Sequence, residues 1–119
     1  MESRREHPIT IAQNPHRVRV VFNGRVVADT TRALTLKEAS YPAVQYVPRE
    51  DAKMELLSRT DRVTHCPYKG DANYFSVNAG GKVLENSIWT YETPFPAMAE
   101  LSGHLAFYPD KVKIEELPG

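Results

Sequence analysis

The sequence predicts a mainly β protein: a single antiparallel domain of about eight short strands with one or two short helical turns. Two observations predict this class. Apolar and polar residues alternate over short runs, as they do in half-buried strands. Clusters of Gly, Pro, Asn and Asp separate these runs, and such residues form turns. The 119 residues suffice for one domain with one core.

The clearest element is a hairpin near the N-terminus. Residues 1–16 are polar, and we expect them to form an N-terminal arm or an irregular covering strand, with one β domain over 17–119. Residues 17–22 alternate, and residues 25–29 form a second β-branched run. The Asn23-Gly24 pair between them is typical of a two-residue hairpin turn, because both residues tolerate positive φ.

The next segments are two strands and a short helical turn. Residues 33–38 alternate, although Leu, Lys, Glu and Ala also favour helices, so a helix stays an alternative there. Pro42 and Pro48 bracket a strand over 43–47. Pro48 followed by Arg-Glu-Asp is typical of a first helical turn, which can continue only to about Leu57.

The second half of the chain is rich in turns and aromatic residues. A loop over 66–71 precedes a strand over 72–77 and a returning strand over 82–90. One or two helical turns follow over 97–101, ended by Gly103. We expect residues 104–108 and 111–116 to form a final hairpin around Pro109-Asp110.

Composition excludes several functions. Fifteen Lys and Arg balance fifteen Asp and Glu, which argues against nucleic-acid or membrane-surface binding by bulk charge. No apolar run could span a membrane or serve as a signal sequence, and we expect a cytoplasmic protein. The lone Cys66 excludes an internal disulfide and a multi-cysteine zinc site, and the four histidines are scattered, so neither a metal nor another cofactor is expected.

One group of side chains combines aromatic rings with a cation. Trp89 and Tyr91 are two apart on a predicted strand and therefore share a face. Together with Tyr68, Lys69 and Tyr74 they could line a cleft that stacks a small flat ring, with Lys69 holding an anionic group. Arg49 and His65 are expected at its rim. The alternative is that these aromatic residues only fill the core of a small β domain.

A second hypothesis is an enzyme that uses Cys66 or His65 as nucleophile or acid/base. Adjacent residues in an extended segment point to opposite faces, so a base for the thiol would have to come from elsewhere, such as His104. The alternative is a buried, inert cysteine. A third hypothesis is a structural or interaction domain that forms a homodimer through a sheet edge.

Four segments resemble a known family in the expected order. They are Tyr-Val-Pro-Arg-Glu-Asp at 46–51, Thr-His-Cys-Pro-Tyr-Lys-Gly-Asp-Ala-Asn-Tyr-Phe-Ser-Val at 64–77, Trp-Thr-Tyr-Glu-Thr-Pro at 89–94 and Leu-Ala-Phe-Tyr-Pro-Asp-Lys-Val at 105–112. The chain resembles the bacterial and fungal family called domain of unknown function 427 from Pro15 to Leu117.

This resemblance implies a β-tent fold, in which two antiparallel sheets meet at one edge and open at the other. The fold is similar to that of the thalidomide-binding domain of cereblon and of methionine sulfoxide reductase B. Many β-tent proteins hold a structural zinc through two Cys-x-x-Cys pairs, which this chain lacks. The aromatic cluster could correspond to the cage of cereblon by analogy of fold alone. A nucleotidyltransferase label also attaches to the family, but the sequence has no phosphate-binding Gly-rich motif that would support it.

Overall fold

The computed structural model describes residues 8–118, which form ten strands in this part of the chain. The strands are β1 (Ile9–Gln13), β2 (Arg17–Phe22), β3 (Arg25–Thr30), β4 (Leu34–Glu38), β5 (Val44–Val47), β6 (Leu57–Cys66), β7 (Gly70–Ala79), β8 (Lys82–Thr90), β9 (Leu105–Phe107) and β10 (Lys113–Leu117). The prediction of a mainly β domain is confirmed, with ten strands in place of about eight.

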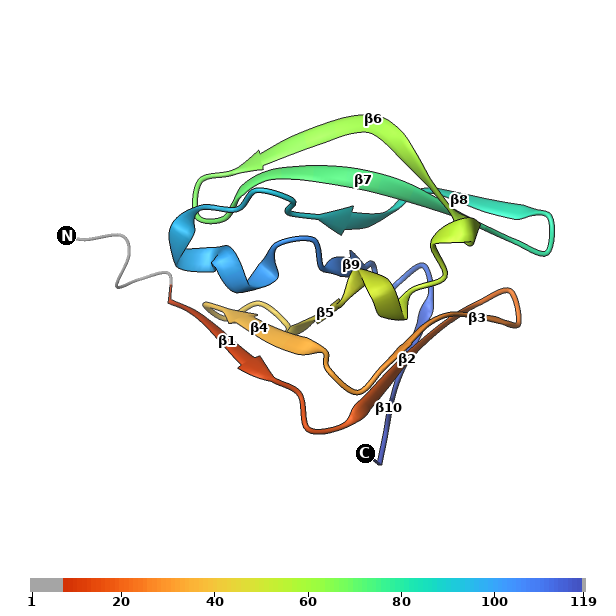
Figure 1. The fold of residues 1–119 in the computed structure, drawn as a ribbon, viewed down its shortest axis with the longest axis horizontal. Helices are drawn as coiled ribbons and strands as arrows, with labels where there is room; N and C mark the ends of the chain where they lie inside the picture. The colour runs from red at the N-terminus through yellow and green to blue at the C-terminus, as the bar shows by residue number, and fades with distance from the viewer. Residues whose placement is uncertain (1–7, 119) are drawn as a thin grey trace.

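The strands form two antiparallel sheets, also as predicted. One has seven strands in the order β1-β4-β5-β9-β8-β7-β6, and the other has three in the order β10-β2-β3. Figure 1 shows the larger sheet curving from β6 and β7 along one side of the molecule to β4 and β1 on the other.

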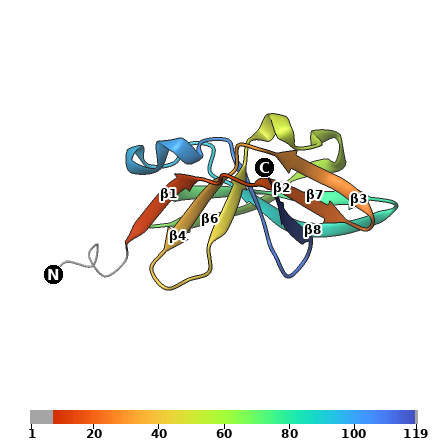
Figure 2. The ribbon, with the colours of Figure 1, turned by 90° about the horizontal axis from the view of Figure 1, so that it is seen from below.

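Three short 3₁₀ segments interrupt the strands: η1 (Arg49–Asp51), η2 (Met54–Leu56) and η3 (Pro96–Leu101). They confirm the predicted helical turns, and Figure 2 shows them on the same side of the sheets. Gly103 follows η3 with φ of 74°, as expected of a residue that ends a helical turn. Within residues 8–118, no helix is long and apolar enough to cross a membrane.

Local turn chemistry explains the elements that were predicted well. Asn23 and Gly24 have φ of 52° and 76°, so the β2–β3 hairpin turns as predicted.

Residues 34–38 form strand β4, which pairs with β1 and β5, so the helical alternative for this segment is wrong. Tertiary pairing outweighs the helix propensity of Leu and Lys in this run.

Two segments differ from the predictions. The hairpin around Pro109-Asp110 is wrong, because β9 pairs with β5 and β8 whereas β10 pairs with β2. The ten-residue strand β6 was not predicted. In the expected N-terminal arm, Ile9–Gln13 pair with β4 as an edge strand, and residues 1–7 lie outside the described part of the chain.

The larger sheet buries side chains on both faces. One face packs against the three-stranded sheet through Phe75, Val77, Ile88, Leu105, Phe107 and their neighbours from β2 and β3. The opposite, curved face carries Leu36, Tyr46, Ala72, Tyr74, Tyr91, Leu101 and Ala106, with Trp89, Tyr108 and Cys66 partly buried beside them. We call these the dry face and the aromatic face.

Candidate functional site

A pocket of about 220 Å³ opens on the aromatic face. Strands β4, β5, β7 and β8 all contribute to it, together with the β6–β7 turn and the residues that follow β8 and β9. Its lining residues are Leu36, Glu38, Val44, Tyr46, Lys69, Tyr74, Trp89, Tyr91 and Tyr108. We call this the aromatic pocket. Because its walls come from several strands of one sheet, the positions of its side chains are fixed by strand pairing.

An ion pair lies in the wall of the aromatic pocket. Lys69 Nζ donates to Glu38 Oε1 at 2.6 Å, and the lysine residue is only 6% exposed. The ammonium also lies 6.0 Å from the centre of the Tyr91 ring, within the range of a cation–π contact. The pocket therefore presents a buried cation whose charge the neighbouring carboxylate balances.

The β6–β7 turn holds Lys69 in this position. The Lys69 amide donates to Cys66 O at 3.2 Å, and Lys69 O accepts from the Phe95 amide at 3.0 Å. Gly70 has φ of 118°, and a Cβ there would meet the Pro94 Cα at 3.4 Å. Glycine tolerates this positive φ and has no Cβ. The turn can therefore pack directly against the segment that follows β8.

Aromatic rings form the remaining walls. Trp89 Nε1 donates to the Tyr46 hydroxyl at 3.1 Å, and the two rings meet edge to face with centroids 6.3 Å apart. Tyr108 lies against the other side of Trp89 with centroids 4.6 Å apart. These contacts fix the indole between two tyrosines and leave a partly exposed ring in the pocket wall.

The hydroxyl groups around the pocket differ in acidity. Burial raises the pKa of Tyr46 and of Tyr91 well above the ordinary tyrosine value. For Tyr108, burial and hydrogen bonding to Tyr74 raise the pKa to about 12. Burial acts in the same direction on Tyr74, but hydrogen bonds from Thr64, Tyr108 and Arg62 outweigh it and lower the pKa of that phenol. Tyr74 is therefore the phenol whose surroundings favour negative charge.

The structure brings together four of the residues predicted for the cleft: Lys69, Tyr74, Trp89 and Tyr91. Tyr68 is partly buried and is not among the lining residues. The prediction missed five residues that line the pocket: Leu36, Glu38, Val44, Tyr46 and Tyr108. Tyr46 and Tyr108 lie in two of the quoted family segments, which is the one signal in the sequence that could have pointed to them.

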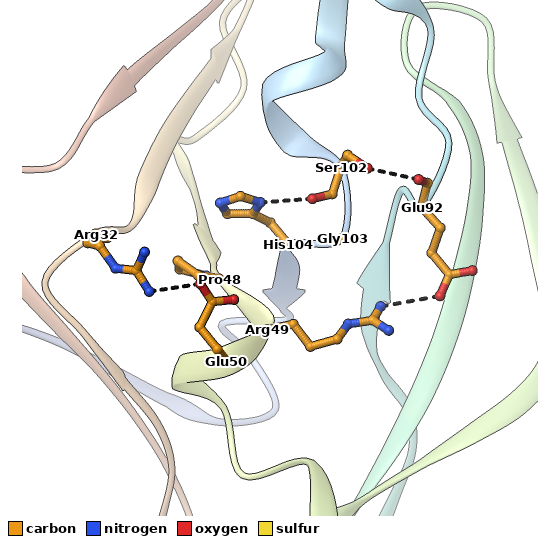
Figure 3. A pocket seen from close by; sticks show the side chains of 8 residues that line it. All are labelled: Arg32, Pro48, Arg49, Glu50, Glu92, Ser102, Gly103 and His104. Atoms are coloured by element: carbon orange, nitrogen blue, oxygen red, sulfur yellow. Dashed lines mark hydrogen bonds and ion pairs between the residues drawn. The ribbon is translucent and has the colours of Figure 1, made fainter.

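Arg49, predicted at the cleft rim, lines a different pocket of about 460 Å³, which we call the polar pocket because four of its lining residues are charged. Figure 3 shows an Arg32–Glu50 pair on one wall of this pocket, an Arg49–Glu92 pair on the other, and the His104 ring between them. His104 Nδ1 lies 3.2 Å from Ser102 O. The two arginines of this polar pocket are each already paired with a carboxylate.

Glu92 is the most heavily bound of these carboxylates. Arg59 makes two hydrogen bonds with it, each 2.8 Å, and Arg49 Nη2 lies 3.2 Å from Oε2. Hydrogen bonding from Arg59 first, and from Arg49 second, lowers the pKa of Glu92 to about 2. Both guanidinium groups also lie over the Phe75 ring, at 5.5 Å and 5.8 Å. This network ties the end of β8 to β6 and η1.

Cys66 and His65 both lie at the end of β6, but their side chains have different surroundings. Cys66 is partly buried against the aromatic cluster, whereas His65 is exposed and its Nδ1 lies 2.8 Å from Asp71 Oδ1. His65 and Asp71 face each other across the β6–β7 pair, and the Phe95 ring contacts the imidazole edge. Within residues 8–118, no three His, Cys, Asp or Glu side chains gather closely enough to hold a metal ion.

Comparison with known proteins places the chain in a family but gives no activity. A search of the curated proteins finds no match. One family model, described as a domain of unknown function (DUF427), matches residues 10–117. This span includes every strand from β2 to β10 and all residues of the aromatic pocket. The chain therefore belongs to the DUF427 family, whose function is unknown.

Proposed function

We propose that the aromatic pocket binds a small planar molecule that carries a neutral carbonyl or amide group. The observation that carries this proposal is the buried Lys69–Glu38 pair in a pocket otherwise lined by aromatic rings and two aliphatic side chains. A buried ion pair adds little net stability, because desolvation of the two charges offsets their attraction. Its position in a pocket wall therefore suits recognition better than stabilisation.

Charge balance selects the polar group of the ligand. The Glu38 carboxylate accepts a hydrogen bond from one N–H group of the Lys69 ammonium, which has three N–H groups to donate. Because the carboxylate already compensates the cation, we propose that a neutral oxygen meets Lys69, in place of the anionic group that the sequence suggested. The pocket volume of about 220 Å³ fits one ring with a small substituent, and Trp89 offers it a stacking surface.

Benzamide is a suitable probe, because it joins one planar ring to one amide. Trp89 is the sole tryptophan of the chain, so its fluorescence reports directly on the pocket. We expect saturable quenching with a dissociation constant on the order of 1 mM, which is reasonable for a ligand of this size. Cyclohexane carboxamide has the same amide without the flat ring, and it should bind at least about tenfold more weakly.

A double variant separates binding from stability. Lys69→Met with Glu38→Leu removes the ion pair while retaining side-chain volume, so unfolding stability should stay within about 1 kcal/mol of the wild type. Benzamide binding should fall at least about tenfold. Lys82→Met, at the exposed start of β8, serves as the matched control and should bind normally. Unchanged binding by the double variant would show that the ion pair has no part in recognition.

We propose an acid/base role for His65 as the second candidate function. The supporting observation is its 2.8 Å contact with Asp71, which would orient the imidazole and leave Nε2 available. The ring borders a pocket of about 320 Å³ that also includes Thr93 and Phe95. If this pocket is catalytic, Asp71→Asn should weaken any turnover that is found. Lys82→Met, which lies outside this pocket, is the control and should leave that turnover unchanged.

A further inference from the structure

Hydroxyl groups and a cation converge on the Tyr74 side of the aromatic pocket. The Tyr74 hydroxyl lies 3.0 Å from Thr64 Oγ1, and Tyr74 and Tyr108 both line the pocket. The Arg62 guanidinium lies 5.0 Å from the centre of the Tyr74 ring, within the range of a cation–π contact. Two hydroxyl groups and a guanidinium group therefore lie together at one edge of the pocket.

An irregularity in β6 places Arg62 there. The register between β6 and β7 shifts between Arg59 and Val63, and the Arg62 amide lies 3.3 Å from Thr60 Oγ1. Bulges of this kind redirect side chains at sheet edges. Arg62 is exposed, and no carboxylate within residues 8–118 forms a salt bridge with it. Its charge is thus available to a ligand.

A second cation lies beside Tyr108. Lys111 Nζ is 5.4 Å from the centre of the Tyr108 ring. The negative charge of Asp110 also acts electrostatically on the Tyr108 hydroxyl and opposes these cations. Arg62, Lys111 and Asp110 together carry one net positive charge. The Lys69–Glu38 pair adds none. The excess positive charge near the pocket therefore lies on Arg62 and Lys111, beside the rings of Tyr74 and Tyr108, and not at Lys69.

We propose that the ligand of the aromatic pocket is an aromatic oxyanion: a planar ring with a neutral carbonyl at Lys69 and a carboxylate-type group bound by Arg62 and the Tyr74 hydroxyl. This inference rests on the proposed function and adds the charge and polarity of the ligand to it. The lowered pKa of the Tyr74 phenol supports it, because surroundings that favour a phenolate also favour another anionic oxygen nearby.

Matched benzamides test this inference. Para- and meta-carbamoylbenzoate carry both groups, and their methyl esters have the same ring and amide without the charge. Titration of the full chain at low ionic strength, followed by Trp89 fluorescence and calorimetry, should give about tenfold tighter binding of at least one carboxylate than of its ester. The difference should shrink in high salt, because Arg62 is exposed.

Two arginine variants locate the effect. Arg62→Gln should reduce the preference for carboxylate over ester to less than about twofold, while benzamide binds as it does to the wild type. Arg25→Gln removes the same charge from the β2–β3 hairpin and should keep the full preference. Thermal unfolding of both variants checks that each is folded.

The outcomes distinguish this inference from the function on which it rests. If benzamide binds and neither carboxylate binds more tightly than its ester, or if Arg62→Gln keeps the preference, the anionic group is wrong and the aromatic pocket stands as a binding site. If benzamide, the carboxylates and the esters all fail to quench Trp89 and give no heat, both proposals are wrong.

Discussion

The two faces of the seven-stranded sheet use the same strands and different chemistry. Phe75, Ile88 and Phe107 point to the dry face, while their chain neighbours Tyr74, Trp89 and Tyr108 belong to the aromatic face. The dry face is purely hydrocarbon at these positions, whereas each neighbour carries an N–H or O–H group. A buried N–H or O–H group on an aromatic ring requires a hydrogen-bond partner. Aromatic rings with such groups recur along one face only, and this distinguishes the wall of a pocket from a face that only fills the core.

The largest difference between the faces should appear when one ring is removed from each. Phe107→Ala removes a ring that is 2% exposed, so it should lower the free energy of unfolding by about 3–5 kcal/mol. Tyr108→Ala removes a partly exposed ring and should cost about 1–2 kcal/mol while weakening benzamide binding. Urea denaturation measures both. Equal costs would mean that the aromatic face is packed as tightly as the dry face.

The backbone conformation of Gly70 helps to position Lys69 on the aromatic face. Gly70→Ala places a Cβ in a left-handed conformation at φ of 118° and close to Pro94, so we expect a loss of about 1–3 kcal/mol in unfolding free energy. The turn would shift and move Lys69, so benzamide affinity should fall as well. Gly81→Ala, at φ of 82° with open space around its Cβ, is the control for strain without displacement of the pocket. It should leave benzamide affinity unchanged.

The smallest effect should come from the charged network that ties β8 to β6. The folded-state pKa of Glu92 is about 2, below its usual 4.5, so its contribution to stability is complete above pH 4.5 and is lost as the pH falls towards 2. Solvent screens this partly exposed network, so we expect a contribution of about 1 kcal/mol. Glu92→Gln should remove that part of the acid dependence, measured by urea denaturation between these pH values.

A Glu92→Gln profile that parallels the wild type between those pH values would show that other carboxylates control acid unfolding. Glu55→Gln is the matched control, because Glu55 is exposed and lies in η2. Benzamide binding should survive in both variants, since Glu92 lines the polar pocket and not the aromatic one.

Elements fixed by local residues could be predicted from the sequence, whereas strand partners could not. The Asn23-Gly24 pair predicted its hairpin correctly, because the turn requires positive φ only at these two residues. Pro109-Asp110 indicated a turn, but a turn does not choose the partner of the next strand, and β10 returned to β2. Strand β6 was missed because its sequence, Leu-Ser-Arg-Thr-Asp-Arg-Val-Thr-His-Cys, is largely polar at an exposed sheet edge.

The same distinction holds for the site. Lys69, Tyr74, Trp89 and Tyr91 were grouped from sequence because they lie on neighbouring strands near one turn. Glu38 comes from β4, four strands from β7 in the sheet, and only the curvature of the sheet brings it to Lys69. Such a nonlocal contact decides the charge of the pocket, and no local pattern contains it.

The central claim is that the aromatic face binds a planar ligand while the dry face does not respond. A residue-resolved NMR titration of the full chain with benzamide tests it most directly. We predict saturable shifts for the Trp89 indole and for the rings of Tyr74, Tyr91 and Tyr108, with little change at Ile88 and Phe107 on the opposite face. Shifts centred on Arg32 and His104 in the polar pocket, or no saturable shifts at all, would contradict the account.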